Sequence, residues 1–267
     1  MTERVRLVLV SHGSSDPRHA RAVGRLGADL AERLGATVVA GFLEHDRPSV
    51  SEILVPPPGV RRTVVLPLLL TAGYHWHHDL PPVVAHDGAT AVLVAPPTMS
   101  TVARAVAPLV EGSRHVVLAG SGSTRASAVA RFAELADRLH TANRAVAVAL
   151  GPDDVPPAVR SDSVVVPVLV ADGGFADRIR AAGARTTAVL GETPGFAEAL
   201  AADLRDVVAD QVDSSEVAVS RVSRHSATAS DRWCPEPPTS SQDRSRPMAN
   251  HTSIRTAMAV TADVSRG

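Results

Sequence analysis

The chain has 267 residues, of which 45% are hydrophobic and 21% charged, and these proportions are typical of a globular protein with well-buried cores. Its 27 basic residues, all arginine, nearly balance 28 acidic ones, so a net charge of -1 gives no electrostatic case for nucleic acid or an anionic membrane as partner. The single cysteine, Cys234, cannot form a disulfide within the chain, and no segment has the pattern of a signal-peptide core. The longest apolar run, 64–72, is too short for a membrane helix. We therefore expect a cytoplasmic protein that does not enter a membrane.

Short apolar runs of strand length alternate along the chain with segments of helical periodicity. The expected strands are 5–10, 37–43, 63–70, 90–95, 115–119, 145–150, 163–170 and 186–190. The expected helices are 17–34, 48–54, 75–86, 100–111, 124–140, 174–182 and 194–211. The strands lack polar alternation, which is typical of parallel strands covered on both faces, so the intervening helices are expected to be crossovers.

The first helix has the clearest boundaries. Asp16 is suited to the N-cap, Pro17 to the first helical position and Gly35 to the residue that ends the helix. Between them, apolar residues recur at three- and four-residue spacing and predict one buried stripe.

An internal repeat divides the chain. Residues 9–14 (LVSHGS) match 118–123 (LAGSGS), and residues 66–73 (LPLLLTAG) match 166–173 (VPVLVADG). The fold class is therefore α/β, with two tandem similar lobes, each a four-stranded parallel sheet flanked by helices.

We expect the first lobe to span residues 1–113 and the second 114–212. Residues 213–267 are rich in Ser, Thr, Arg and Pro, have few large apolar residues, and are expected to form a disordered tail. Cys234 lies in this tail, which argues against a structural or catalytic role for it.

Three candidate metal ligands follow three successive strands. His12 comes directly after the first strand, Glu44 after the second, and His75 after the third and its 71–73 turn. The carboxyl ends of parallel strands meet at one edge of a sheet, where ligands bind. Two imidazoles and a carboxylate suit a first-row divalent ion. The alternative is that each is an ordinary surface loop residue in a chain with 11 histidines.

Further polar residues lie near these candidates. Asp79, four residues after His75 on an expected helix, is placed either to orient the His75 ring or to interact, exposed, with the helix dipole. His45, His77 and His78 are expected to be solvent-exposed, the alternative being a relay that collects metal.

Small residues flank the two histidines. Gly13 and Gly73 allow the backbone to approach a flat ligand closely, and Ser14 offers N–H and hydroxyl groups to carboxylates. The alternative, a tight turn that needs positive φ, is compatible with this interpretation. A dinucleotide-binding loop at 120–122 is disfavoured because Arg125 stands where the third glycine is required.

Three motifs in order give the chain a family resemblance. They are 11–14 (SHGS), 42–44 (FLE) with 48–49 (PS), and 66–75 (LPLLLTAGYH) leading to 79–81 (DLP). With these motifs the chain resembles the CbiX-type sirohydrochlorin chelatases, class II chelatases related to ferrochelatase. The resemblance implies two α/β lobes with a cleft in which a sirohydrochlorin-like tetrapyrrole receives a metal, for sirohaem or a cobalamin precursor.

The resemblance also implies residue roles. His12 and His75 would bind the metal and take the pyrrole protons, with Glu44 assisting. The metal, Fe²⁺ or Co²⁺, is a substrate, and no nucleotide is expected. In the second half Ser121 and Phe175 stand where the two histidines would be, so we expect only the first half to be catalytic and the second to close the cleft.

Two other functions would also use a histidine after the first strand. A non-catalytic metal or tetrapyrrole carrier would keep the same binding residues. A histidine phosphatase would need arginine before the His-Gly pair, where this chain has Ser11. Since a duplication can replace a homodimer, both a monomer and a homodimer are compatible with the sequence.

Overall fold

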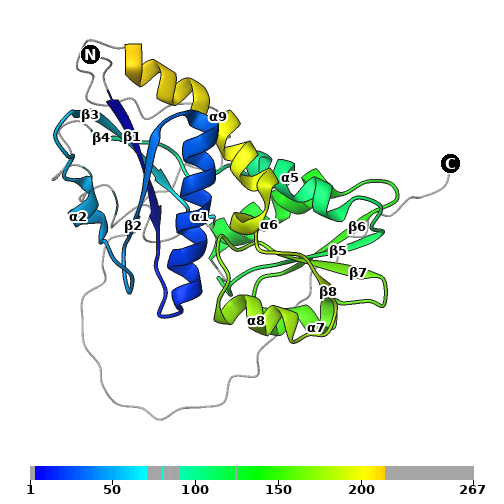
Figure 1. Ribbon diagram of the computed structural model, residues 1–267. Coiled ribbons are helices and arrows are strands. Elements are labelled where there is room, and N and C mark those ends of the chain that lie inside the picture. Colours follow the sequence, from blue (N-terminus) through cyan, green and yellow to red (C-terminus); the bar gives the residue numbers. More distant parts are fainter. Residues whose placement is uncertain (1–3, 71–79, 81–83, 85–90, 124, 214–267) are drawn as a thin grey trace, which may run out of the picture.

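Two separate parallel sheets form the framework of the molecule (Figure 1). The computed structural model describes residues 4–70, 80, 84, 91–123 and 125–213. The first sheet has the order β2-β1-β3-β4 and the second the order β6-β5-β7-β8. Every strand pair in both is parallel. The two sheets therefore repeat one topology, which confirms the fold class expected from the internal repeat.

The strands of the first sheet are β1 (Arg4–Ser11), β2 (Thr37–Phe42), β3 (Val60–Pro67) and β4 (Ala91–Leu93). Those of the second are β5 (His115–Ala119), β6 (Ala145–Ala149), β7 (Ser163–Pro167) and β8 (Arg185–Thr186). The helices are α1 (Pro17–Leu34), α2 (Val50–Leu54), α5 (Met99–Val106), α6 (Ala126–Leu139), α7 (Val155–Ala158), α8 (Gly174–Arg180) and α9 (Pro194–Asp213). Short 3₁₀ helices are η1 (Ala107–Val110), η2 (Pro152–Asp154) and η3 (Leu190–Glu192).

The first helix follows its sequence signals closely. Asp16 caps α1 by accepting a hydrogen bond from the Arg18 N–H, Pro17 is its first residue, and Gly35 ends it in the left-handed conformation at φ 60°. The apolar stripe that includes Leu26 and Leu30 is buried. The expected helix 75–86 lies outside the described residues, apart from two of its positions.

Strand ends are where the sequence-based expectations were wrong. β3 and β7 stop at Pro67 and Pro167, although the apolar runs continue for three more residues. The N–H of Leu68 still donates to Val10 O, whereas Leu70 is buried beyond the sheet, as is Leu190, which was expected in a strand but begins η3. Apolar character indicates burial, and burial does not require pairing in a sheet.

One continuous core joins the two halves. The largest buried cluster contains residues of β1 and β3 together with residues of β5 and β7. Helix α9, at the end of the described chain, packs on α1 and α5, and α5 also packs on α6 (Figure 1). Arg131 of α6 donates to the carbonyls of Leu70 and Pro97, at 2.7 and 2.6 Å.

The expected lobe boundaries at residues 113 and 212 stay a prediction. Residues 214–267, the expected tail, lie outside the described chain.

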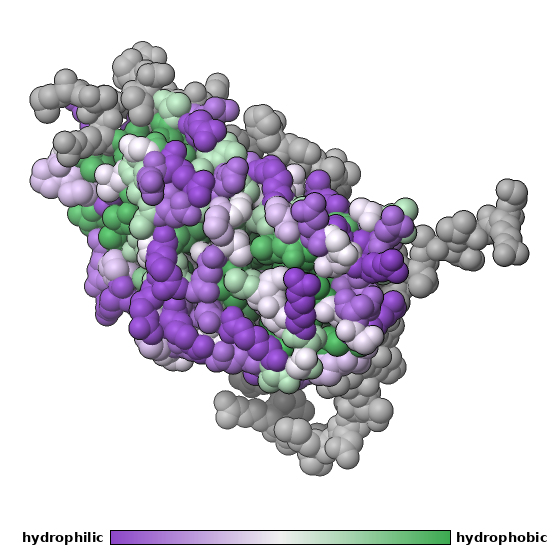
Figure 2. All heavy atoms as spheres, turned by 45° about the vertical axis from the view of Figure 1, so that its right-hand side comes forward, coloured by the Kyte–Doolittle hydropathy of each residue, from purple (hydrophilic) through white to green (hydrophobic). Residues whose placement is uncertain are grey.

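No helix in the described ranges is both long enough and apolar enough to cross a bilayer. The face of the molecule in Figure 2 is covered largely by hydrophilic side chains, with smaller hydrophobic areas between them.

Each lobe buries one polar pair at the start of its central strands. In the first, Arg6 of β1 donates to the Thr63 hydroxyl of β3 at 3.2 Å. In the second, His115 of β5 bonds through Nδ1 to the Ser163 hydroxyl of β7 at 2.7 Å, and only 4% of His115 is exposed. Burial, together with the nearby Arg160, lowers the pKa of His115.

The lowered pKa of His115 predicts a pH-dependent stability. The unfolded chain takes up a proton near the ordinary pKa of about 6.5, whereas the folded chain resists it, so this contribution is present above that pH and is lost as the pH falls. As the pH is lowered from about 7.5 to about 5.5, the unfolding free energy of the unmutated chain should fall. In urea titrations we expect a smaller fall for His115→Gln, which has no group that titrates at this position. His140→Gln, at an exposed position, serves as the control and should keep the original slope. Equal slopes for all three proteins would contradict this prediction.

Candidate functional site

The ends of β1 and β2 place His12 beside Glu44. Ser11 pairs with Phe42 in the parallel register, and the pairing continues into the loops through two hydrogen bonds. The N–H of Leu43 donates to Ser11 O at 3.1 Å, and the N–H of Glu44 donates to His12 O at 2.8 Å. Glu44 is exposed and His12 is partly exposed, so both side chains are accessible from this edge of the sheet. Two of the three predicted ligands are therefore neighbours.

Gly13 makes this close approach possible. Its φ is 92°, and a Cβ on this residue would lie 1.7 Å from the carbonyl oxygen of Glu44. The expected positive-φ turn is confirmed, and the contact that excludes a side chain comes from the chain's own neighbouring loop.

The polar groups of Ser14 are already used within the chain. Its N–H donates to Asp46 Oδ2 at 3.0 Å, and its hydroxyl accepts the N–H of Asp16 at 3.1 Å. Asp46, which the sequence analysis did not single out, thus ties the β2–α2 loop to the β1–α1 loop.

His45 lies next to both candidate ligands. Its ring centroid is 6.4 Å from that of His12, and its Nε2 lies 3.6 Å from Glu44 Oε2. His45 has a φ of 64°, a conformation that is uncommon for a residue other than glycine. It is exposed, as expected, and its position adds a second imidazole to this edge of the sheet.

The His12 ring is oriented by a local contact. Its Nδ1 lies 3.3 Å from Gly13 O, and when Nδ1 carries the proton it donates to that carbonyl. Nε2 is then the nitrogen with the lone pair that a metal or a proton needs.

His19 is a site residue that the sequence analysis missed. It is in the first turn of α1, and its Nε2 lies 2.8 Å from the hydroxyl of Ser11. Its half-buried ring packs edge-on against Phe42, with centroids 6.3 Å apart. Burial lowers the pKa of His19, and the nearby Asp46 acts in the opposite direction. The available signal was its position in the first helical turn, from which side chains point back toward the preceding strand.

The second lobe reaches this edge through α8. Arg18 of α1 binds both Asp16 and Asp177 of α8 at 2.6 Å. Its hydrogen bonds lower the pKa of Asp16 to about 2. A Cβ on Gly173, at the end of the β7 loop, would lie 3.7 Å from Asp16. The end of the loop between β7 and α8 therefore lies against the start of α1, close to the loop that carries His12.

The counterparts of the histidines in the second lobe have different chemistry. Ser121 is partly exposed, and Phe175 is 48% exposed at the start of α8. Neither side chain is a usual ligand for a divalent first-row ion.

The remaining predicted residues fall in a segment that the structure does not describe. His75, Gly73, His77, His78 and Asp79 lie outside the described residues. Within the part of the chain that is described, no three His, Cys, Asp or Glu side chains form a group able to hold a metal ion.

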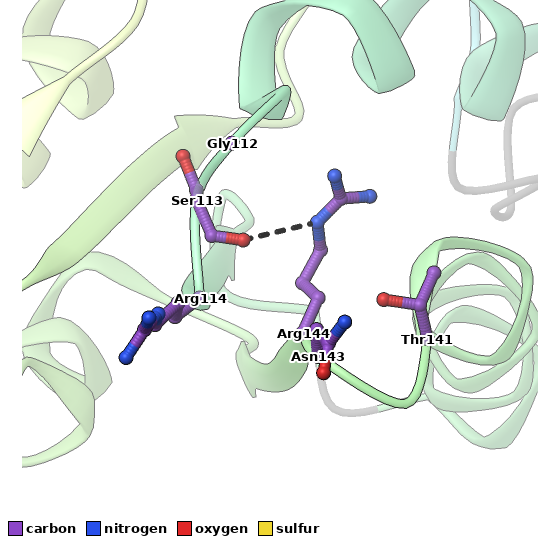
Figure 3. A pocket seen from close by; sticks show the side chains of 6 residues that line it. All are labelled: Gly112, Ser113, Arg114, Thr141, Asn143 and Arg144. Atoms are coloured by element: carbon purple, nitrogen blue, oxygen red, sulfur yellow. Dashed lines mark hydrogen bonds between the residues drawn. The ribbon is translucent and has the colours of Figure 1, made fainter.

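Two hollows lie away from His12 and Glu44. One, of about 600 Å³, opens at the amino ends of β5 and β6, where Arg144 donates from Nε to Ser113 O at 3.3 Å (Figure 3). It is lined by Gly112, Ser113, Arg114, Thr141, Asn143 and Arg144. Because it lies at the opposite edge of the second sheet from the loops that follow the strands, it is not part of the site. The other, of about 390 Å³, lies between α1 and η3.

Solved structures of two other proteins have a similar fold. SirB from Bacillus subtilis subspecies spizizenii, solved in complex with cobalt, aligns with 78% of this chain and 96% of its own, with a TM-score of 0.62 and 19% identity. CbiX, described as the terminal enzyme for biosynthesis of siroheme in denitrifying bacteria, aligns with 76% of this chain and 99% of its own, with a TM-score of 0.56 and 17% identity. At these identities the likeness establishes the fold.

The sequence places the chain in a family. The CbiX family model matches residues 6–104, which include His12, Glu44 and His75. A sirohydrochlorin cobaltochelatase of Methanococcoides burtonii is 30% identical over 93 residues, which are 34% of this chain and 71% of that relative. One of Saccharolobus islandicus is 37% identical over 84 residues, 31% of this chain and 65% of that relative. The chain belongs to the CbiX family, as its resemblance predicted.

The contact between Gly13 and Glu44 predicts a severe effect of a single methyl group. Gly13→Ala must move the Glu44 carbonyl and also strains a positive φ, so we expect a loss of more than about 2 kcal/mol in unfolding free energy by urea titration. Gly24→Ala, in α1 with nothing within 4 Å of the added Cβ, is the matched control and should be neutral or stabilising by up to about 1 kcal/mol. Equal unfolding free energies for the two variants would show that the close approach of Gly13 to Glu44 does not affect stability.

Proposed function

We propose that the chain is a sirohydrochlorin chelatase that inserts a divalent metal, Fe²⁺ or Co²⁺, into the tetrapyrrole for sirohaem or cobalamin biosynthesis. The observation that carries this proposal is the placement of His12 beside Glu44 at the carboxyl edge of the first sheet, in the segment matched by the CbiX model. The named activity of the relatives and the two-lobed fold support it.

The reaction exchanges two pyrrole protons for one divalent ion. The site must therefore hold a partly dehydrated ion weakly, deliver it to the macrocycle and accept protons near neutral pH. An imidazole with an ordinary pKa near 6.5 can bind metal and accept protons, and a carboxylate adds negative charge that favours both the ion and the departing protons.

In this proposal His12 and His75 bind the metal and take the protons, while Glu44 supports both steps. His12 and Glu44 are accessible to solvent, which suits an ion that must leave the protein with its product. A fully buried, closed ligand set would hold the ion as a structural metal. His45 adds a further imidazole on the same edge, in a position to receive the ion before His12.

The metal is a substrate in this scheme. Imidazole and carboxylate ligands accept Fe²⁺ and Co²⁺ alike, so the ligand set does not by itself select between the two pathways. The relatives are named cobaltochelatases, and SirB structures exist with Fe³⁺ and with cobalt. We expect the insertion to require no nucleotide.

The macrocycle is proposed to lie between the lobes, with Gly13, Ser14 and Gly73 near it. The contact of Asp16 with Gly173 supports this arrangement, because it brings the loop after β7 next to the loop that carries His12. The second lobe, with Ser121 and Phe175 in place of histidines, would close the cleft without supplying metal ligands. A monomer or a homodimer, located in the cytoplasm, remains the expected form.

The proposal predicts the effect of removing each ligand. Under anaerobic conditions, with excess sirohydrochlorin and either Fe²⁺ or Co²⁺, we expect His12→Ala and His75→Ala to lower the insertion rate at least about 100-fold, and Glu44→Gln by less. Absorbance spectroscopy of the metallated product measures each rate. His140→Ala, an exposed histidine outside the site, should retain the full rate.

Two outcomes would count against this assignment. Unchanged rates in both histidine variants would remove His12 and His75 from the reaction. If the unmutated chain bound metal or tetrapyrrole but never formed more product than protein, it would be a carrier and not an enzyme.

A further inference from the structure

A second histidine lies directly behind the loop that carries His12. His19 Nε2 is 2.8 Å from the hydroxyl of Ser11, the residue that precedes His12. Ser11 is 2% exposed, so its hydroxyl depends on a protein partner for its hydrogen bond. Among the described residues, His19 is the side chain that supplies this bond.

The same ring also contacts the second loop. His19 packs edge-on against Phe42, the last residue of β2, and Phe42 lies two residues before Glu44. Ser11 and Phe42 are paired across β1 and β2. One side chain thus contacts the residues at which both ligand-bearing loops leave the sheet.

The second lobe provides an internal comparison. There, Gly120 corresponds to Ser11. Ala128 corresponds to His19, since each is the third residue of its helix, α6 and α1 respectively. The ring of Phe132 lies 2.8 Å from where a Cβ on Gly120 would be, so a serine would not fit. This lobe has neither the hydroxyl nor the imidazole, and Ser121 replaces the histidine that they would support.

The second lobe nevertheless builds the same turn. Gly122 has a φ of 110°, matching the 92° of Gly13. The N–H of Val168 donates to Ala119 O at 2.8 Å, as that of Leu68 donates to Val10 O at 2.7 Å. The strand, turn and helix therefore form without a Ser–His pair, and folding alone does not account for the pair in the first lobe.

We infer that Ser11 and His19 are positioning residues for His12, and that their hydrogen bond sets the direction in which the His12 imidazole is presented to the metal. This inference rests on the proposed role of His12. A metal requires a defined ligand geometry, which is lost when the backbone that carries the ligand can rotate by a few tens of degrees. Groups that orient ligands typically contribute about 10- to 100-fold to metal affinity or activity.

The test compares variants that keep or remove the hydrogen bond. His19→Phe keeps a ring against Phe42 but has no group to bond Ser11, whereas His19→Gln keeps a polar nitrogen and oxygen on a side chain of similar reach. Ser11→Ala removes the other partner. The exposed His140→Phe is the matched control.

Two measurements are made on each full-length variant. We expect His19→Phe and Ser11→Ala to weaken Co²⁺ binding, measured by titration calorimetry with the metal alone, by about 10-fold or more, and to lower kcat for insertion with little change in the KM for sirohydrochlorin. His19→Gln should restore most of both. Because the two residues act as one unit, the double variant should be no worse than either single variant.

The outcomes separate this inference from the proposed function. A His19→Phe variant that unfolds more easily but binds Co²⁺ as tightly as the unmutated chain would show a structural role only and would overturn the inference. If sirohydrochlorin were not metallated by the unmutated chain, the proposed function would fail, while the Co²⁺ affinities would still decide the role of His19. Absence of Co²⁺ binding by the unmutated chain would overturn both.

Discussion

The close contact between the first two loops is the constraint on which the site depends. Gly13 lies so near the Glu44 carbonyl that no side chain fits between them, and the hydrogen bond from the Glu44 N–H to His12 O extends the β1–β2 pairing past the sheet. Parallel strands in register carry their loops to the same edge, and here the backbone itself locks the two loops together. The polar side chains can remain accessible because the backbone beneath them is fixed.

The duplicated architecture separates stability from chemistry. Both lobes have the same strand order, the same positive-φ turn and a buried polar pair at the start of their central strands. They share one core, to which β1 and β5 both contribute, and helices of the two halves pack on each other, α9 on α1 and α5 on α6. The second lobe keeps these packing features while Ser121 and Phe175 occupy the ligand positions. Packing constrains the core of each lobe, whereas the exposed rim tolerates the change.

Ion pairs made by arginines of α1 connect this helix to the second lobe. Arg18 binds an acidic residue of its own helix cap and one of α8, and Arg25 binds Glu192 of η3 at 2.5 Å. These pairs are largely exposed and add little to the free energy of folding. They connect α1 to the second lobe at two places, near its start through Arg18 and further along the helix through Arg25. Residues of both lobes therefore lie beside the candidate site, although its proposed ligands come from one.

The sequence alone determined the number and order of the strands, the first helix with its Asp16 cap, the duplication, the family and the adjacency of His12 and Glu44. These features depend on local periodicity, on capping chemistry and on the rule that parallel strands end at one edge. The tertiary structure alone decided that Leu70 is buried beyond the end of β3, that Asp46 accepts the hydrogen bond of the Ser14 N–H, and that the His19 ring lies against the Ser11 hydroxyl. The reason is that these contacts join different elements, and their distances follow from how helices and loops pack, which no local pattern of residues encodes.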